Sequence, residues 1–325
     1  MSREEELKKE VTVQPNSLVI ERPKNGEEKT DSFSCSYRLI EPFSYLSHDG
    51  NQNRALLILN QEIDLDLIPL WELSSIVVCA DGAANRLYEY FANKPNLTKD
   101  TCAQLQSKYI PNYIVGDFDS IDKEIAQFYK SQGAHLIEQS SEYINDFSKA
   151  ILCIQLHFQF LANGEAWPDN IEVENGLSQI WETKFSNLSS IPIKVNTLSA
   201  IGGRFDQTIQ SINQLYILHQ TAKNLEIFFH THNDIIFLLY KGVNYVAYPS
   251  KTTFSRMGDK IPPTCGLLPL SNKPIILSSH GLKYDVKHWK TQMMGYVSSS
   301  NRIVGETGFI VECSDDIVMN IEVDF

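Results

Sequence analysis

The sequence predicts an α/β protein in which a doubly wound, mainly parallel sheet is followed by an all-β domain. Three observations carry this prediction: continuous apolar runs that suit buried parallel strands, helical spacing between those runs, and a change to short β-rich runs late in the chain. At 325 residues the chain exceeds the usual size of one compact core. We expect an N-terminal extension over 1–52, an α/β domain over 53–222 and an all-β domain over 223–325.

The α/β domain is predicted from a repeated strand, turn and helix pattern. The apolar run at 75–80, for example, leads into Asp81-Gly82, and the residues that follow recur at helical spacing. The predicted strands are 55–59, 75–80, 113–115, 135–137 and 194–201, and the predicted helices are 83–91, 121–129, 147–158 and 207–216. Alternation of this kind indicates a right-handed parallel sheet. A polar stretch at about 161–190 interrupts the pattern, and we interpret it as an insertion.

Beyond about residue 222 the texture of the sequence changes. Short runs rich in β-branched and aromatic residues, bounded by Gly, Pro and Asn, stand at 225–229, 234–240, 245–248 and 309–311. No helical spacing separates them as it does earlier in the chain. A separate all-β domain is the simplest interpretation.

Composition and charge exclude several classes of protein. The formal net charge of −12 disfavours a nucleic-acid surface and suits a cationic small substrate. The longest apolar runs are far too short to span a membrane. Six scattered cysteines without a C-x-x-C pair suggest neither a zinc site nor a disulfide framework, and the acidic N-terminus lacks the apolar core of a signal peptide. We therefore expect a cytoplasmic protein.

Aspartate-rich segments follow the predicted strands and precede the predicted helices. They are Gly116-Asp117-Phe118-Asp119-Ser120, Asn145-Asp146-Phe147 and Gly202-Gly203-Arg204-Phe205-Asp206-Gln207, and Asp81 stands at the tip of the strand at 75–80. In doubly wound folds, ligands bind at the edge where the strands end. Carboxylates are hard ligands for Mg²⁺, and an arginine offers a bidentate fork to phosphate. The segments together predict a magnesium-nucleotide site.

Each segment has a simpler interpretation when it is taken alone. Asp81, Asp117 and Asp146 could each cap the helix that follows, and Arg204 could form an ion pair with Asp206. The alternation of His230 and His232 beside a strand end could indicate a metal site, although such pairs are more often solvated or hydrogen-bonded. The expected convergence of the acids at one sheet edge favours a ligand site over three separate caps and an ion pair.

Taken in order, these segments resemble the thiamin pyrophosphokinase family, particularly its fungal form. The segments that carry the resemblance are the three above, Ala80-Asp81-Gly82-Ala83-Ala84-Asn85, Cys265-Gly266-Leu267-Leu268-Pro269, Gly281-Leu282-Lys283-Tyr284-Asp285-Val286 and Val297-Ser298-Ser299-Ser300-Asn301. The resemblance extends from about residue 54 to the C-terminus, outside the insertion. It implies a nucleotide-binding α/β domain, a thiamin-binding β-sandwich, and transfer of pyrophosphate from ATP to the hydroxyl of thiamin with release of AMP.

The resemblance also implies roles for individual residues. Asp117, Asp119 and Asp146 would hold Mg²⁺, Arg204 would contact phosphate, Asp81, Asp206 and Gln207 would place nucleotide or reacting groups, and Gly116 and Gly203 would let the backbone approach the nucleotide. Tyr284, Ser298, Ser300 and Asn301 would bind thiamin. Members of the family pair as homodimers with sites built from both subunits, so a homodimer is expected.

Three positions depart from the family pattern. Asn145 stands where the family usually has Thr or Ser, Tyr284 where it often has Trp, and Glu142 where it often has Gln or Lys. The first two retain a polar or stacking side chain, whereas Glu142 adds negative charge near the expected phosphates. The alternatives to the enzyme are a non-catalytic thiamin or nucleotide sensor on the same scaffold, and a Mg²⁺-dependent phosphatase or glycosyltransferase built around Asp117 and Asp119.

Overall fold

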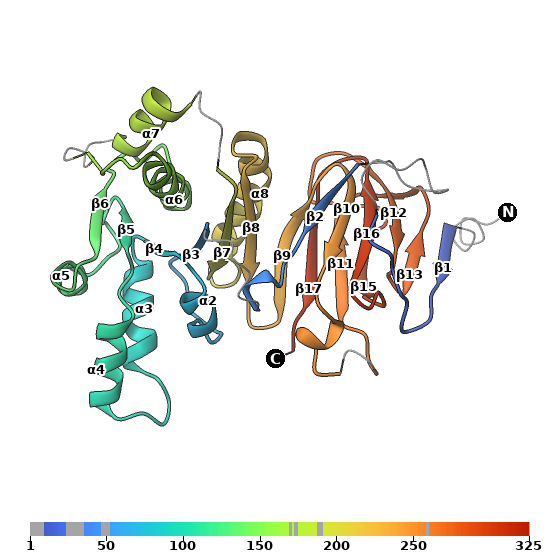
Figure 1. Ribbon diagram of the computed structural model, residues 1–325, viewed down its shortest axis with the longest axis horizontal. Coiled ribbons are helices and arrows are strands. Elements are labelled where there is room, and N and C mark those ends of the chain that lie inside the picture. Colours follow the sequence, from blue (N-terminus) through green and yellow to red (C-terminus); the bar gives the residue numbers. More distant parts are fainter. Residues whose placement is uncertain are drawn as a thin grey trace. The chain divides into compact units, whose positions relative to one another are not determined.

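The computed structural model describes residues 10–23, 36–46, 53–168, 171, 175–186, 191–257 and 260–324. The chain divides into two compact units. The α/β unit is Gly50–Thr231, and the β unit combines Met1–Asp49 with His232–Phe325 (Figure 1). Within the described ranges, no helix has the length and apolar character needed to cross a membrane.

The α/β unit is built on a parallel sheet in the order β8-β7-β3-β4-β5-β6. Its strands are β3 (Arg54–Ile58), β4 (Ile76–Ala80), β5 (Tyr113–Gly116), β6 (His135–Glu138), β7 (Ile193–Leu198) and β8 (Leu225–His230). Every residue of β3, β4 and β5 is buried. Their continuous apolar sequence is what a strand covered on both faces requires.

Helices cover both faces of this sheet. They are α2 (Ile68–Glu72), α3 (Ala83–Ala92), α4 (Lys99–Lys108), α5 (Lys123–Ser131), α6 (Asp146–Asn163), α7 (Gly176–Ile180) and α8 (Phe205–Thr221). Figure 1 shows α6 and α7 on one side of the strands and α3 and α4 on the other. This arrangement confirms the predicted doubly wound α/β fold. The short α2 and the polar α4 were not predicted, because neither carries a clear apolar stripe.

The order of the strands creates a topological switch point. From β3 the chain moves outward through β4, β5 and β6, and it then returns to the other side of β3 to form β7 and β8. The connections that leave β3 and β7 therefore diverge, and the loops that follow these two strands flank a crevice at the carboxyl ends of the strands. Doubly wound folds bind their ligands at such a crevice.

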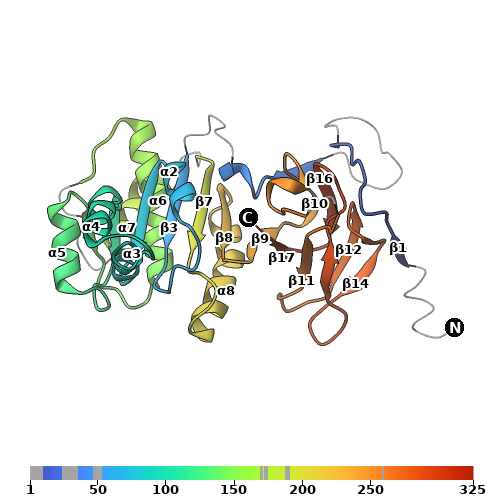
Figure 2. The same cartoon turned by 90° about the horizontal axis from the view of Figure 1, so that it is seen from below.

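The β unit contains two larger sheets and one two-stranded sheet and confirms the predicted all-β domain, seen as a sandwich in Figure 2. One sheet has the order β14-β12-β16-β10-β2, from β14 (Trp289–Thr291), β12 (Ile275–His280), β16 (Gly308–Cys313), β10 (Gly242–Ala247) and β2 (Tyr37–Ile40). In the other, β15 (Ser298–Arg302), β11 (Thr264–Leu268), β17 (Ile317–Glu322) and β9 (Asp234–Leu239) pair antiparallel in that order. The remaining strands, β1 (Val11–Val13) and β13 (Tyr284–Val286), pair with each other.

The N-terminal segment differs from the extension predicted over 1–52. Its described residues supply β1 and β2, and β2 lies parallel to β10 at the edge of a sheet. Ile20 is buried in a cluster with Val243, Tyr245 and Ile310. The sequence shows no period here because the strands are short and find their partners more than two hundred residues away.

The boundary between the units also lies later than predicted. The run at 225–229 was assigned to the all-β domain, but β8 pairs in parallel with β7 and belongs to the α/β unit. A short buried β-run looks the same in either setting. The helix α8 before it indicates a further strand, helix, strand unit.

The predicted insertion at 161–190 is tied to the sheet where the structure describes it. Helix α6 runs through to Asn163, and α7 lies within the insertion. The indole Nε1 of Trp167 donates to the hydroxyl of Tyr113 at 2.9 Å. The buried amide of Gln139 bonds to the carbonyl of Ile171 and the N–H of Leu177. These bonds attach the insertion beside β5 and β6.

We predict that His230 makes the stability of the protein fall in mild acid. Its buried ring has Nε2 at 2.8 Å from Oδ1 of Asn196, and burial lowers the pKa of His230 to about 3. As pH falls below about 6.5 the unfolded chain takes up a proton that the folded chain does not, so about 1.4 kcal/mol of stability is lost per pH unit until about pH 3.

Urea unfolding at about pH 7.5 and pH 5.0 checks this prediction. The wild type should lose roughly 2 kcal/mol more than His230→Gln between these values, because glutamine does not titrate. Equal losses in the two proteins would contradict it.

Candidate active site

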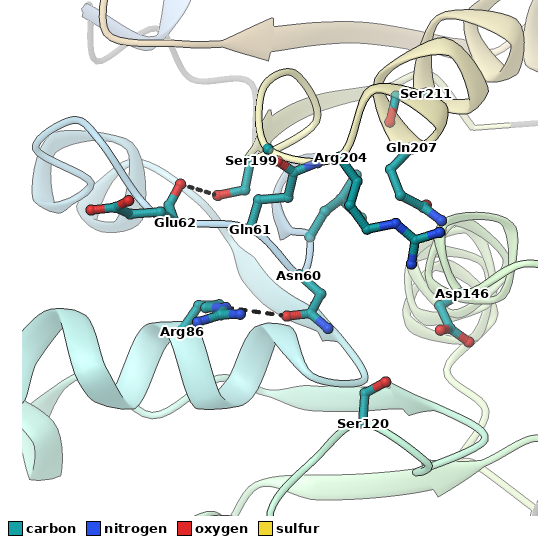
Figure 3. A pocket seen from close by; sticks show the side chains of 12 residues that line it. Asn60, Gln61, Glu62, Arg86, Ser120, Asp146, Ser199, Arg204, Gln207 and Ser211 are labelled. Atoms are coloured by element: carbon teal, nitrogen blue, oxygen red, sulfur yellow. Dashed lines mark hydrogen bonds between the residues drawn. The ribbon is translucent and has the colours of Figure 1, made fainter.

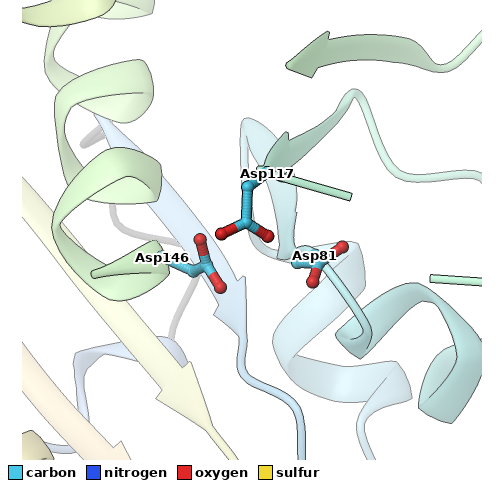
Figure 4. Close-up of side chains that lie close together, drawn as sticks. All are labelled: Asp81, Asp117 and Asp146. Carbon is cyan, nitrogen blue, oxygen red and sulfur yellow. The ribbon is translucent and has the colours of Figure 1, made fainter. Parts of the chain in front are cut away.

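Three carboxylates meet where the central strands of the α/β unit end. Asp81 follows β4, Asp117 follows β5 and Asp146 is the first residue of α6. One carboxylate oxygen from each lies within 4.8 Å of the other two (Figure 4). Because β4 and β5 are adjacent and parallel, their carboxyl ends deliver side chains to the same place. Among the described residues, no other group of three His, Cys, Asp or Glu side chains gathers in this way.

Asp81 is the buried member of the group. Its backbone has a φ of 44°, its N–H donates to the carbonyl of Val115, and its Oδ2 accepts from the N–H of Ser120 at 3.1 Å. The other oxygen, Oδ1, is buried without a hydrogen-bond partner in the described part of the protein. Burial raises the pKa of Asp81 to about 6, and the negative charge of Asp146 contributes to the rise.

Gly116 makes the approach of the two strand ends possible. A Cβ atom at this position would lie 2.5 Å from the Cβ of Asp81 and 3.1 Å from its Cα. No side chain fits at those distances without moving the backbone. The glycine that the sequence analysis assigned to nucleotide contact therefore has a steric role beside Asp81.

Asp119 lies outside the group of three. It was predicted to bind metal with Asp117 and Asp146, but it is exposed, and its Oδ1 accepts from the hydroxyl of Ser120 at 2.7 Å. This hydrogen bond lowers the pKa of Asp119. Its N–H donates to Asp117 at 3.3 Å. Asp81, and not Asp119, joins Asp117 and Asp146 in the group of three, and Asp119 lies exposed beside that group. The predicted metal-binding role of Asp119 stays a prediction.

Lys149 is a buried cation at the same site, and the sequence analysis missed it. Its side chain is 4% exposed, and its Nζ lies 3.0 Å from Oδ1 of Asp146 and 3.7 Å from Oδ2 of Asp117. The lysine stands three residues after Asp146 on α6, so helical spacing alone places both side chains on one face. Burial raises the pKa of Asp146, and the hydrogen bond from Lys149 partly offsets that rise.

The helix that carries Asp146 and Lys149 begins at a side-chain cap. Oδ1 of Asn145 accepts from the N–H of Ser148 at 2.8 Å. Asn145 is one of the departures from the family pattern, and asparagine caps a helix as well as serine or threonine does. The cap accounts for Asn145, and Asp146 is left to face the other carboxylates.

A cavity of about 570 Å³ opens at the switch point beside the acids. Its walls come from the loops after β3 and β7, the starts of α6 and α8, and α3 (Figure 3). A second cavity of about 280 Å³ shares Asn60, Asp146 and Gln207 with it and also contacts Asp117, Lys149 and Glu142. Asp117 and Asp146 therefore lie in the wall of an open crevice, whereas Asp81 is buried behind it.

The glycine-rich turn before α8 forms one wall of the larger cavity. Gly202 and Gly203 have φ values of 108° and 57°, in the left-handed region that favours glycine. Arg204 is largely exposed, and its guanidinium forms an ion pair with Asp206. This pair is the simpler interpretation that the sequence analysis left open. It also holds the Arg204 side chain on the cavity wall beside Gln207, as Figure 3 shows.

Several residues in the wall of the cavity were not named from the sequence. They are Leu59, Asn60, Gln61, Glu62, Arg86, Ser199 and Ser211. Nε of Arg86 lies 3.3 Å from Oδ1 of Asn60, which connects α3 to the loop after β3. Their position in the sequence could have identified some of them, because polar residues 60–62 follow an apolar strand just as the aspartate segments do.

The residues predicted to bind thiamin lie in the β unit. Tyr284 is at the start of β13 and is 47% exposed. Ser298 and Ser300 lie on β15, and Ser300 is exposed with a φ of 61°. Asn301 is buried, and its side-chain amide hydrogen-bonds to the backbone of Tyr284. The structure brings Tyr284 and Asn301 into direct contact.

The comparisons with known proteins agree with each other. Residues 67–229 match the family model described as thiamin pyrophosphokinase, catalytic domain, and residues 254–318 match the vitamin B1 binding domain of the same enzyme. A thiamine pyrophosphokinase of Saccharomyces cerevisiae is 37% identical over 94% of this chain and 96% of its own. Among solved structures, a thiamin pyrophosphokinase from Candida albicans is 53% identical, with a TM-score of 0.82 over 97% of this chain and 98% of its own. The crystal structure of the yeast enzyme is 33% identical, with the same TM-score over 97% of both chains.

We predict that Gly116→Ala disrupts the group of three carboxylates. The added methyl group must displace Asp81, at a cost of about 1–3 kcal/mol in unfolding free energy. It should also weaken the binding of Mn²⁺ to the nucleotide-free protein. The control is Gly133→Ala, which loses stability through its φ of 99° but has no atom within 4 Å of the added carbon, so it should keep its metal affinity. Loss of stability without loss of metal affinity in Gly116→Ala would contradict the prediction.

Proposed function

The chain belongs to the thiamin pyrophosphokinase family, and from this premise we propose how its residues divide the work of the reaction. That reaction transfers pyrophosphate from ATP to the hydroxyl group of thiamin and gives thiamin diphosphate and AMP. A bond forms between the hydroxyl oxygen and the β-phosphorus, and the bond from that phosphorus to the bridging oxygen of AMP breaks. The chemistry requires alignment of the two oxygens and neutralisation of phosphate charge.

We propose that Asp81, Asp117 and Asp146 hold Mg²⁺. The fit rests on the meeting of three carboxylates within 4.8 Å and on the buried, unpartnered Oδ1 of Asp81. Oxygen ligands of this kind suit a small hard cation. When bound, Mg²⁺ would neutralise charge on the phosphate oxygens. Asp119, first predicted as a ligand, is adjacent to this group and is proposed to act beside it.

Arg204 is proposed as the main phosphate-binding cation. It lines the cavity, is largely exposed, and already presents its guanidinium to one carboxylate, Asp206. A phosphate offers the same bidentate geometry with more charge. Arg86, from α3, lines the same cavity and is available as a second cation. Gly203, on the same turn, is proposed to let the backbone approach the nucleotide, and its φ of 57° lies in the region that favours glycine.

Lys149 is proposed to balance the charge of the three carboxylates. Without it, three negative groups would share a small and partly buried volume, which raises their pKa values and favours protonation over metal binding. With it, the site carries a formal charge of −2, which one divalent cation neutralises. Its short contacts with Asp146 and Asp117 also hold these side chains in one orientation.

In the β unit, Tyr284 is proposed as the aromatic surface for thiamin, with Ser298 and Ser300 as polar contacts. Thiamin contains a cationic thiazolium ring and an aminopyrimidine ring, and both suit the face of a tyrosine. Tyrosine in place of the tryptophan common in the family retains this surface. The amide of Asn301 is engaged with the backbone of Tyr284, so its role is proposed to be indirect.

A homodimer and a cytoplasmic location complete the proposal. Large apolar side chains are exposed in both units, including Met293 and Met294 in the β unit and Phe205 in the α/β unit, and a second copy would cover such surface. All five cysteines in the described part of the chain are free thiols, as expected in a reducing compartment. No observation favours the sensor over the enzyme, because the proposed metal and phosphate ligands are all present.

The test of the proposed site is thiamin-dependent AMP release from Mg-ATP. AMP and thiamin diphosphate should appear in equal amounts. Removal of Mg²⁺, or Asp117→Asn, should lower turnover at least about a hundredfold, because both remove charge stabilisation of the transferring group. Asp100→Asn, an exposed aspartate on α4, is the matched control and should not change the rate. Full turnover in Asp117→Asn would exclude it from the metal site.

A second prediction concerns Lys149. At about pH 8, where the carboxylates stay ionised even without the lysine, Lys149→Gln should bind Mn²⁺ several-fold more tightly without nucleotide, since a positive charge within about 4 Å of the ligands is removed. Turnover should nevertheless fall, because the carboxylates lose the contact that orients them. Lys149→Arg keeps the charge and should leave metal affinity within about twofold. Weaker metal binding in Lys149→Gln than in Lys149→Arg would show that the lysine does not act by balancing the negative charge of the carboxylates.

A further inference from the structure

Strand β13, which carries Tyr284, depends on a distant part of the chain for its pairing. It has three residues and pairs with β1 in the register Val13 with Tyr284. The N–H of Gln14 donates to the carbonyl of Lys283 at 2.9 Å. The Lys283 ammonium donates a hydrogen bond to the carbonyl of Gln14 at 2.6 Å. Residues 10–18 are here called the strap, and residues 10–14 of it lie along β13, as Figure 1 shows for β1.

The strap is fixed in place by a buried lysine. Lys251 is fully buried, and its Nζ donates to the carbonyl of Asn16 at 3.0 Å and pairs with Glu306 at 3.0 Å. A buried ammonium is costly unless its hydrogen bonds are satisfied, and the strap supplies one of them. Leu18 adds two backbone bonds, one to Val304 and one to Glu306. The strap is therefore an integral part of the β unit rather than a loose end.

On its other side, Tyr284 is held by Asn301. Oδ1 of Asn301 accepts from the N–H of Tyr284 at 3.0 Å, and Nδ2 donates to the carbonyl of Tyr284 at 3.0 Å. Oδ1 also accepts from the N–H of Arg302 at 2.8 Å. The amide is buried and bound on both sides, so it acts on the backbone of β13. Tyr284 thus sits between the strap and a side-chain clamp.

We propose that the strap and Asn301 are positioning elements of the thiamin subsite that act through Tyr284. The inference rests on the proposed role of Tyr284 in binding thiamin. Nearly half of this side chain is exposed, so its position depends on the backbone that carries it. The strap lies outside both stretches that match the family models.

The test uses the full chain with Gln14→Pro, which removes the donor to Lys283. The Michaelis constant for thiamin should rise about tenfold while that for ATP stays within about twofold, because the α/β unit is untouched. Deletion of residues 1–13, which removes β1, should act in the same way. Deletion of residues 1–9 leaves the strap whole and is the matched control. Thermal unfolding checks that each variant is folded. An unchanged Michaelis constant for thiamin in folded Gln14→Pro would overturn the inference.

A double-mutant cycle separates this inference from the proposed function. If the strap acts through Tyr284, Gln14→Pro and Asn301→Ala should each raise the Michaelis constant for thiamin when Tyr284 is present. Neither should raise it further in a protein that already carries Tyr284→Ala. Equal effects in both backgrounds would overturn the inference alone. If Tyr284→Ala by itself leaves thiamin binding unchanged, the proposed role of Tyr284 fails, and this inference fails with it.

Discussion

The site depends on the close approach of two parallel strand ends. Asp81 leaves β4 with a left-handed backbone, and Gly116 ends β5 against it without room for a side chain. This contact sets the separation between Asp81 and Asp117, and α6 then adds Asp146 and Lys149 on one helical face. Strained backbone of this kind persists where the surrounding structure holds it. Here the fully buried strands β3, β4 and β5 do so.

The charges of the site form a sequence from core to solvent. Lys149 and Asp81 are buried, Asp117 and Asp146 are partly exposed, and the arginines line the open cavity. In the proposed function, the buried negative charge attracts Mg²⁺ and the positive charge that lines the cavity binds the phosphates. The overall charge of −12 would repel ATP, so these local cations must counter the field of the whole protein. Glu142 in the adjoining cavity works against them.

Much of this arrangement was predictable from the sequence, for a definite reason. An apolar run indicates a buried strand, and an acid between that strand and the next helix lies at the edge of the sheet where the strands end. Asp81, Asp117 and Asp146 were identified in this way. Local geometry was not predictable in the same way, because the sequence did not indicate that Asp81 rather than Asp119 joins Asp117 and Asp146. Pairings between distant segments could not be predicted from the sequence either. The strap, β2 and the amide clamp of Asn301 depend on contacts that no sequence period records.

The division of the chain has a consequence for its synthesis. The α/β unit is contiguous, whereas the β unit is assembled from both ends of the sequence. During translation the first strands emerge long before β10 and β13, their partners, exist. The central segment can therefore fold while the chain is still growing, and the N-terminal strands must wait. Closing so long a loop is slow, because the entropy is lost before the contacts form. The thiamin subsite would then be the last part of the enzyme to mature.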